Sequence, residues 1–353
     1  MTRRAIVHIG WPRTGTTSFQ FLLDRLRPTL AEAGVLYPDL TPDKAPRPHL
    51  SHQHLGETLD GRHPRTTREE LLGKLDAALA ATRCDVALLS YEGLAQLRRA
   101  GPVAEMLAAL FERRGFSLEI MATVKPQDAF LNSAYTWRCQ FLREARSFAP
   151  YARAELGNRR LDYAAVLAPW RVAAAGRVLV VPVRDRRSDE SLVWRLFDAL
   201  GLLDRVRGSL SDGDLARREN SSPGPVAVAA SRWLHRQGVA SVLGADARSA
   251  GRYLEVAAQA RGRDAATFCG LTPPLAARLE ARFAAANDAF AEQVWGCPWA
   301  ARVAPEPARE ANEILAADPD VTAVVDATLR QFGLSRRGGP PAWLGRRWRR
   351  DPA

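Results

Sequence analysis

The sequence predicts a three-layer α/β fold, in which a parallel β-sheet is flanked by helices and a mostly helical C-terminal part follows. Short apolar runs alternate with longer segments whose apolar residues recur every three or four positions. The first run enters a glycine-bounded turn that leads directly into a helical pattern. No confident strand is found beyond about residue 204. Strands separated by helices are typical of a parallel sheet, which binds its ligands at the carboxyl ends of its strands.

The elements follow one another in a regular alternation. Four strands are predicted, at residues 5–9, 86–89, 118–124 and 178–182. The first helix runs from the glycine-bounded turn to about residue 33, with Pro28 either kinking it or starting its second half. Residues 37–64 are rich in proline and histidine and predict a long loop. Further helices are predicted at residues 66–82, 102–114, 127–146, 161–175, 189–200, 223–237, 247–261, 273–294 and 306–332.

The chain of 353 residues is long enough to bury a large core. We expect an α/β domain over residues 1–300 and a helical extension over residues 301–334. Residues 335–353 hold six arginines, two tryptophans and several glycines and prolines, which predicts a basic, disordered tail.

Composition is ordinary for a globular chain, with 46% hydrophobic and 25% charged residues. No apolar run approaches the roughly 20 residues that cross a bilayer. The chain enters a strand almost at once, which leaves no room for a signal peptide. The four cysteines lie far apart without CxxC spacing, which argues against a zinc site and a disulfide framework. We therefore expect a cytoplasmic, reduced protein.

The net charge of +11 comes almost entirely from arginine, since the only lysines are Lys44, Lys74 and Lys125. Such a charge favours association with anionic nucleotides and acidic glycans, but it does not indicate which reaction the protein catalyses. We expect no nucleic acid partner. The arginines and tryptophans of the tail suggest a weak contact with an anionic membrane surface, as an alternative to a simple solvated extension.

The segment after the first strand carries the strongest chemical signal. Gly10 and Gly15 frame a turn, and Thr16 and Thr17 follow at the start of the helix. This spacing fits the phosphate-binding pattern GxxxxGK[ST], except that Thr16 replaces the lysine. The only cation in the loop is Arg13. Backbone N–H groups at a helix start converge on an anion, so the segment predicts a phosphate site.

In this form the segment resembles the 5′-phosphosulfate loop of sulfotransferases that use 3′-phosphoadenylyl sulfate (PAPS). The resemblance rests on Pro12-Arg13-Thr14-Gly15-Thr16-Thr17. It implies a sulfotransferase-like P-loop fold, PAPS as co-substrate and no metal. It also implies that Trp11, Arg13, Thr14, Gly15, Thr16 and Thr17 contact the nucleotide, although core packing is a simpler role for Trp11. Arg13 would act as an electrostatic clamp on the leaving phosphate oxygen, because an arginine does not deprotonate at working pH.

A second anion grip is predicted at the exit of the strand at 118–124. Lys125 follows this strand, and Ser133 lies two turns into the next helix, where the two could hold one phosphate. Sulfotransferases place an arginine and a serine at this spacing around the 3′-phosphate of PAPS, so Lys125 is a departure that weakens bidentate recognition. Arg218 lies in a segment that resembles the loop closing over the nucleotide. Residues 283–296, which include Asn287, resemble the family's terminal helix.

Sulfonyl transfer also needs a base that removes the proton of the acceptor. Two candidates remain open. Glu92 follows the strand at 86–89, and strand ends are held rigidly. His52 lies in a histidine-rich loop, and its ordinary pKa of about 6.5 suits proton transfer.

The favoured function is transfer of a sulfonyl group from PAPS to a hydroxyl or amine of a carbohydrate or another small polar acceptor. A P-loop kinase of small molecules is one alternative, but the loop lysine is missing and Ser90 stands where an aspartate would hold magnesium. A non-catalytic binder of anionic polymers is another alternative, and its affinity should fall steeply with salt.

Overall fold

The structure is a computed structural model that describes residues 3–11, 13–43, 45, 49–63, 66–216, 222–262 and 264–335. Packing divides the chain into two compact units, each built from three stretches. The first unit takes Met1–Gln127, Gly157–Asn220 and Glu280–Glu306, and the second takes Asp128–Leu156, Ser221–Leu279 and Pro307–Ala353. The predicted boundaries at residues 300 and 334 stay predictions. The two compact units are each built from separated stretches, so they do not test a division of the chain into consecutive domains.

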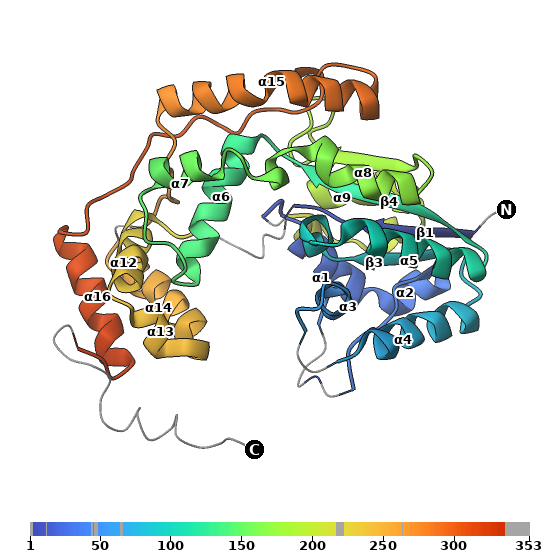
Figure 1. The fold of residues 1–353 in the computed structure, drawn as a ribbon, viewed down its shortest axis with the longest axis horizontal. Helices are drawn as coiled ribbons and strands as arrows, with labels where there is room; N and C mark the ends of the chain where they lie inside the picture. The colour runs from blue at the N-terminus through green and yellow to red at the C-terminus, as the bar shows by residue number, and fades with distance from the viewer. Residues whose placement is uncertain are drawn as a thin grey trace. The chain divides into compact units, whose positions relative to one another are not determined.

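A five-stranded, fully parallel sheet forms the centre of the first unit (Figure 1). Its strands are β1 (Arg3–His8), β2 (Val35–Leu36), β3 (Val86–Ser90), β4 (Phe116–Val124) and β5 (Val178–Pro182). Their order across the sheet is β2-β3-β1-β4-β5, so the first strand lies in the middle. The prediction of a parallel sheet flanked by helices is confirmed, and β2 is a short edge strand that sequence analysis missed.

Helices cover both faces of this sheet because successive side chains of a strand point to opposite sides. On one face, Ile6, Leu88 and Met121 pack in a buried cluster with Phe19 of α1 and Phe197 of α9. On the other face, α5 and α8 pack against β4 and against each other. The helices of this unit are α1 (Thr17–Arg25), α2 (Arg27–Glu32), α3 (Gln53–Leu59), α4 (Arg68–Ala81), α5 (Ala100–Arg113), α8 (Tyr163–Ala173), α9 (Leu192–Ala199), α10 (Leu203–Val206) and α11 (Asp212–Ala216).

Local signals explain where several of these helices begin. Pro28 stands in the first turn of α2, so it starts the second half of the predicted helix. The hydroxyl of Thr67 accepts a hydrogen bond from the backbone N of Glu70 at 3.1 Å, which caps α4. The predicted long loop at 37–64 is wrong over α3, because Leu55 and Leu59 form a buried stripe one turn apart within the histidine-rich segment.

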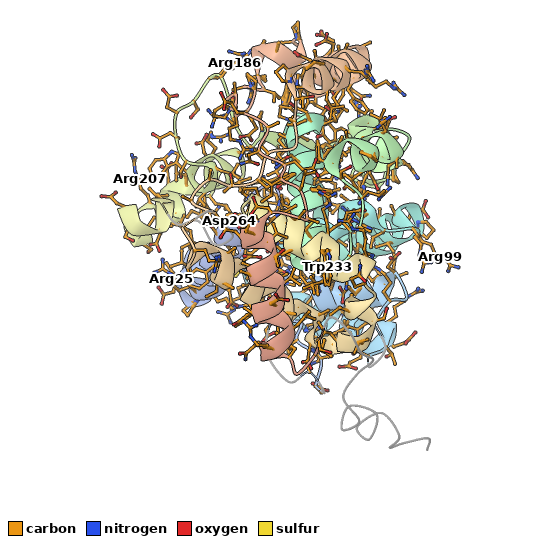
Figure 2. The ribbon with its side chains drawn as sticks, turned by 90° about the vertical axis from the view of Figure 1, so that its left-hand side faces the viewer. Arg25, Arg99, Arg186, Arg207, Trp233 and Asp264 are labelled. Carbon is orange, nitrogen blue, oxygen red and sulfur yellow. The ribbon has the colours of Figure 1, made fainter. Side chains whose placement is uncertain are left out.

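Exposed arginines of the first unit come from different elements. Figure 2 labels Arg25 at the end of α1, Arg99 before α5, Arg186 in the loop after β5 and Arg207 after α10. Part of the positive charge is therefore spread over the unit and not gathered on one helix.

The described part of the second unit is helical. It contains α7 (Phe148–Glu155), α12 (Pro225–Arg236), α13 (Val239–Leu243), α14 (Ala247–Gln259) and α16 (Pro319–Gln331), while α6 (Gln127–Gln140) and α15 (Pro273–Trp295) run from one unit into the other. Helices α12, α14 and α16 share a buried apolar cluster. Asp264, labelled in Figure 2, caps α12 by accepting hydrogen bonds from the backbone N of Val226 and Ala227. Burial raises the pKa of this carboxyl.

Two predicted helices differ from the structure, and α7, α10, α11 and α13 were not predicted. The helix predicted at 127–146 ends at Gln140, and Leu142 then adopts a left-handed φ of 51°. The helix predicted at 306–332 begins only at Pro319, because Asp318 caps it and proline is favoured at the first helical position. In the part of the chain that the structure describes, no helix has the length and apolar character needed to span a membrane. Most of the predicted tail lies outside the described residues.

Candidate functional site

Three loops leave the carboxyl end of the sheet side by side because β1 lies between β3 and β4. His8 at the end of β1 pairs in register with Ser90 at the end of β3. The loop after β1 carries Arg13, the turn after β3 carries Glu92, and Lys125 follows β4. The strand order therefore brings together three segments that the sequence presents far apart. This is also the edge at which parallel sheets bind ligands.

The glycine-rich loop (residues 10–17) bends through two left-handed residues, Arg13 with φ 71° and Gly15 with φ 83°. Glycine adopts this conformation without strain, whereas an arginine pays a steric cost of about 1 kcal/mol or more. Gly15 is exposed at the tip of the turn. Thr17, half-buried, is the first residue of α1, and no acidic side chain occupies the first turn of this helix. The helix dipole at this end favours an anion.

Thr14 ties the loop to the sheet. Its buried hydroxyl donates to the carbonyl of Trp11 at 2.6 Å and lies 2.8 Å from the hydroxyl of Thr123 in β4. Thr14 therefore fixes the loop to β4, and its hydroxyl is used in hydrogen bonds within the protein. Its predicted contact with the nucleotide would have to come through its backbone.

Trp11 packs in the core of the first unit and is only 1% exposed. Its indole N–H donates to the carbonyl of Arg160 at 2.6 Å, and its ring stands edge-on to that of Tyr163. These contacts favour the packing role over contact with a nucleotide.

Lys125 joins β4 to the glycine-rich loop. Its ammonium donates to the carbonyl of Arg13 at 2.9 Å, and its own carbonyl accepts a hydrogen bond from the hydroxyl of Tyr163. Lys125 thus supports the left-handed turn at Arg13 and brings a positive charge to it. Ser133 lies further along α6, in the part that belongs to the second unit. Arg218 lies outside the described residues.

Glu92 opens a short 3₁₀ helix (Glu92–Gln96) directly after β3. One carboxylate oxygen accepts a hydrogen bond from the hydroxyl of Thr16 at 2.9 Å, and the other accepts from the amide of Gln20 at 3.0 Å. Thr16 and Gln20 stand one turn apart on α1, so they present their donors on the same face. The hydroxyl of Thr16 does not cap α1, because it is used to bind Glu92. Glu92 is therefore fixed against the start of the helix that follows the glycine-rich loop.

His52 is buried, and both of its ring nitrogens are taken. Nδ1 accepts a hydrogen bond from the backbone N of Ser90 at 2.9 Å, and Nε2 lies 2.9 Å from the carbonyl of Pro38. Because an acceptor carbonyl requires a donor, Nε2 carries the proton and the ring is neutral. Burial lowers the pKa of His52 to about 4. Through these two hydrogen bonds, His52 links the loop at residue 38 to the end of β3.

His8 is a site residue that sequence analysis missed. It is completely buried at the end of β1, and its Nδ1 lies 2.7 Å from the hydroxyl of Ser90. Burial lowers its pKa to about 4, against the opposing charge of Glu92. The sequence does carry a signal for His8. It is a titratable residue within the apolar run that comes just before the glycine-rich loop.

Gln127 and Asn287 bind each other through reciprocal side-chain hydrogen bonds of 2.7 and 2.9 Å. Both are buried, and the amide of Gln127 also lies within 3.2 Å of the carbonyl of Leu161. Here they join the start of α6 to α15.

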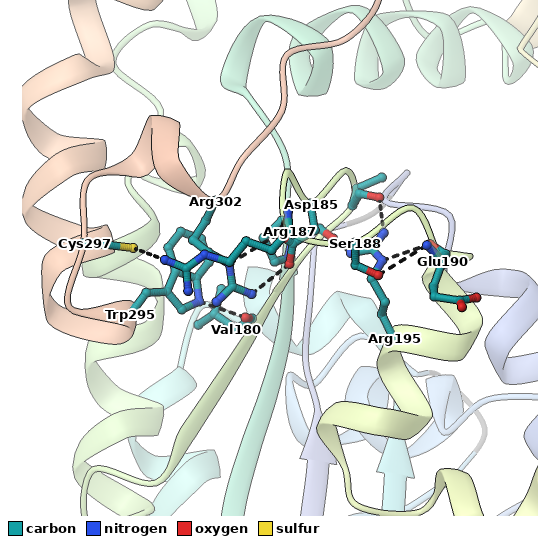
Figure 3. Close-up of polar contacts among 11 residues, drawn as sticks. Val180, Asp185, Arg187, Ser188, Glu190, Arg195, Trp295, Cys297 and Arg302 are labelled. Atoms are coloured by element: carbon teal, nitrogen blue, oxygen red, sulfur yellow. Dashed lines mark hydrogen bonds and ion pairs between the residues drawn. The ribbon is translucent and has the colours of Figure 1, made fainter.

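The exit of β5 is held by ion pairs and backbone contacts and not by a glycine turn (Figure 3). Asp185 binds the guanidinium of Arg302, which lowers the pKa of this carboxyl against the effect of its burial. Arg195 of α9 donates to the carbonyls of Pro182 and Val183 at the end of the strand. The pair of Asp185 and Arg302 fastens the segment after α15 to the loop that leaves β5, and Arg195 fastens α9 to the end of the same strand.

No group of three or more histidine, cysteine, aspartate or glutamate side chains suited to a metal ion occurs among the residues that the structure describes. Three other histidines, His49, His54 and His63, form a separate cluster, in which Nδ1 of His54 lies 3.1 Å from Nε2 of His63.

No protein-family model matches the chain, and no curated protein matches it. Among solved structures, the chain is similar to a sulfotransferase from Alicyclobacillus acidocaldarius, with 17% sequence identity and a TM-score of 0.37. The alignment covers 57% of this chain and 82% of the other. A similarity of this extent assigns neither the family nor the reaction. The function is therefore argued from the residues of this chain.

Proposed function

We propose that this protein transfers a sulfonyl group from PAPS to a hydroxyl or amine of a carbohydrate or another small polar acceptor. The observation that carries the proposal is the hydrogen bond between Thr16 and Glu92. It places a carboxylate against the start of α1, beside a glycine-rich loop that holds an arginine and no lysine. An anion grip next to a base is what in-line group transfer requires.

In this proposal the start of α1 and the backbone of the glycine-rich loop bind the 5′-phosphosulfate. The acceptor oxygen or nitrogen attacks sulfur, and the bond between sulfur and the bridging phosphate oxygen breaks. The proton of the acceptor passes to Glu92, and the electron pair of the broken bond stays on the phosphate of the departing nucleotide. Arg13 stabilises that charge without giving up a proton.

Glu92 is a better base than His52 on the geometry of the site. Both nitrogens of His52 are bound within the protein, and the ring is buried. Glu92 is only partly buried, and an ionised carboxylate has about four acceptor positions, of which Thr16 and Gln20 occupy two. Acceptor positions thus remain on Glu92 for the proton of a substrate.

The 3′-phosphate is assigned to Lys125 and Ser133 on their spacing along the chain. Lys125 already lies at the sheet edge that carries the glycine-rich loop, through its bond to the carbonyl of Arg13. A lysine binds a phosphate as a point charge, so we expect moderate discrimination in favour of 3′-phosphorylated nucleotides.

Calorimetry with adenosine 3′,5′-bisphosphate, compared with ATP and magnesium, tests the proposal. Micromolar binding of the bisphosphate and none of ATP is the expected result, and Ser133→Ala should weaken this binding more than it slows turnover. Arg83→Ala is the matched control, because Arg83 is exposed and lies before β3, at the opposite end of the sheet. Binding of ATP with magnesium alone would select a kinase. An affinity that rises with the number of phosphates in the ligand and falls steeply with salt concentration would indicate a binder of anionic polymers.

A further inference from the structure

A buried chain of hydrogen bonds leads from Glu92 into the sheet. The amide nitrogen of Gln20 lies 3.0 Å from one oxygen of Glu92 and 3.1 Å from the hydroxyl of Ser90. The hydroxyl of Ser90 lies 2.7 Å from Nδ1 of His8. Four residues from three segments, β1, α1 and the end of β3, are thus connected in a single line.

Donor and acceptor rules favour one direction for the bonds in this chain. An ionised Glu92 only accepts, so Gln20 turns its NH₂ group toward it, and the second hydrogen of that group goes to Ser90. Ser90 then accepts from Gln20, and its own hydrogen goes to Nδ1 of His8. In this arrangement His8 is neutral, which agrees with a pKa that burial lowers to about 4, and its proton lies on Nε2, which is buried without a hydrogen-bond partner among the described residues.

The other tautomer of His8 leaves more polar groups without partners. A His8 protonated on Nδ1 would donate to Ser90, whose hydroxyl oxygen has two lone pairs and could still accept from Gln20. The hydroxyl hydrogen of Ser90 would then have no acceptor in this chain of hydrogen bonds, and Nε2 of His8 would be a buried acceptor without a donor. The arrangement described above leaves one such group, the N–H at Nε2, and each buried donor without an acceptor costs about 1–3 kcal/mol.

The surroundings leave His8 little freedom to leave this arrangement. Its ring stands edge-on to Phe19 at 5.9 Å between centroids. A methyl group built on Gly10 would come within 3.4 Å of Nε2 and 3.0 Å of the hydroxyl of Thr123. The glycine-rich loop therefore passes close over His8, and a side chain at Gly10 would press on both groups.

We propose that His8 is a positioning residue for Glu92: by accepting the hydrogen of Ser90, it turns the lone pairs of that hydroxyl toward Gln20, which then binds both Ser90 and Glu92 with its two amide hydrogens. Glu92 is thereby oriented toward the site above the glycine-rich loop. The inference deepens the proposed function and rests on Glu92 being the base. The polarity of the hydrogen-bond chain, in contrast, is a property of the fold that can be measured without any substrate.

The polarity is tested by NMR on the full chain labelled with ¹⁵N in its histidines. His8, assigned by loss of its signals in His8→Asn, should be neutral at pH 7 and protonated on Nε2. Ser90→Ala should alter its tautomer or its titration, because the hydroxyl that fixes Nδ1 is gone. A charged His8 at pH 7, or a proton on Nδ1, overturns the proposal. His52, whose Nδ1 accepts from a backbone N–H, is the internal reference for an Nε2-protonated ring.

The positioning role is tested by comparing His8→Phe with His8→Asn in a sulfate-transfer assay. His8→Phe removes the acceptor and should lower kcat about 100-fold, the size expected when a catalytic group is misplaced by about 1 Å. His8→Asn keeps an acceptor oxygen in place of Nδ1 and should recover most of the turnover.

Binding of adenosine 3′,5′-bisphosphate separates the possible failures. Both variants should bind it within about threefold of the wild-type affinity, because His8 does not contact the nucleotide in this proposal. Equal loss of turnover in both variants would reduce His8 to a packing residue, and wild-type turnover in His8→Phe would also reject the role. If His8→Phe does not fold, Ser90→Ala provides the same comparison with a smaller change. A wild-type protein that binds no nucleotide refutes the proposed function while leaving the NMR result to decide the polarity of the chain.

Discussion

Gln127 and Asn287 lie 160 residues apart in the chain and bind each other through both of their amide groups. Each side chain is buried and is satisfied largely by the other. The two residues are thus partners in a structural contact between α6 and α15.

Removing one member of this pair should cost more than removing both. Gln127→Leu leaves a buried amide without partners and should lower the free energy of unfolding by about 1–3 kcal/mol. Asn287→Leu should cost a similar amount, whereas the double variant should recover a substantial part of the loss. Urea unfolding of the four proteins measures the coupling energy. Additive losses would show that the two amides are independent.

Arg13 is expected to act in turnover more than in folding. Arg13→Ala should lower kcat about 100–1,000-fold, the range for removal of one electrostatic contact with a developing charge. Arg13→Lys keeps the charge without the guanidinium fork and should retain part of the rate. A sulfate-transfer assay at saturating PAPS is the measurement. An unchanged rate in Arg13→Ala would remove the clamp from the mechanism.

Substitutions of Glu92 and of His52 should have different effects on turnover and on stability. Glu92→Gln should lower kcat by at least about 100-fold, because proton transfer by a positioned base contributes this much or more. His52→Ala should lower stability, since it empties a buried position that is bonded to Ser90 and Pro38, but folded protein should turn over at a near wild-type rate. Turnover per folded molecule, with folding followed by circular dichroism, gives the answer. The opposite pattern would make His52 the base.

Mild acid should destabilise the fold through its two buried histidines. His8 and His52 are neutral in the folded state, with pKa values lowered to about 4, whereas in the unfolded chain they titrate near 6.5. Between these values the unfolded state binds more protons, so stability falls as pH decreases from about 6.5 to about 4. Each histidine should account for about 3 kcal/mol over the whole interval.

Urea unfolding at pH 7 and at pH 5 measures this dependence. His8→Asn and His52→Asn should each flatten the curve, because the residue that gains the proton on unfolding is gone. A free energy of unfolding that does not change between these pH values would contradict the neutral, buried state of both rings.

Local patterns were sufficient to predict much of the sheet and its flanking helices. The strand predicted at 178–182 coincides with β5, and the helix predicted at 66–82 corresponds to α4. Boundaries were less well predicted where local signals compete. Asp318 with Pro319 is a stronger helix start than the prolines at 305 and 307, which explains the late beginning of α16.

The site residues were predictable as single positions but not as a network. An apolar run can be recognised in the sequence alone, and a polar residue that follows it can be recognised with it. This applies to Arg13, Glu92 and Lys125. The bonds of Thr16 to Glu92 and of Lys125 to the carbonyl of Arg13 depend on strand order, which alternation of strands and helices does not specify. The roles assigned to these residues stay predictions until binding and turnover are measured.

The first unit is assembled from three separated stretches, the last of which ends at residue 306. All five strands precede residue 183, whereas Asn287 and Arg302, the partners of Gln127 and Asp185, are translated later. The nascent chain therefore carries every strand of the sheet before it has the last stretch of the same unit. Truncation before residue 280 would leave the sheet without these two partners.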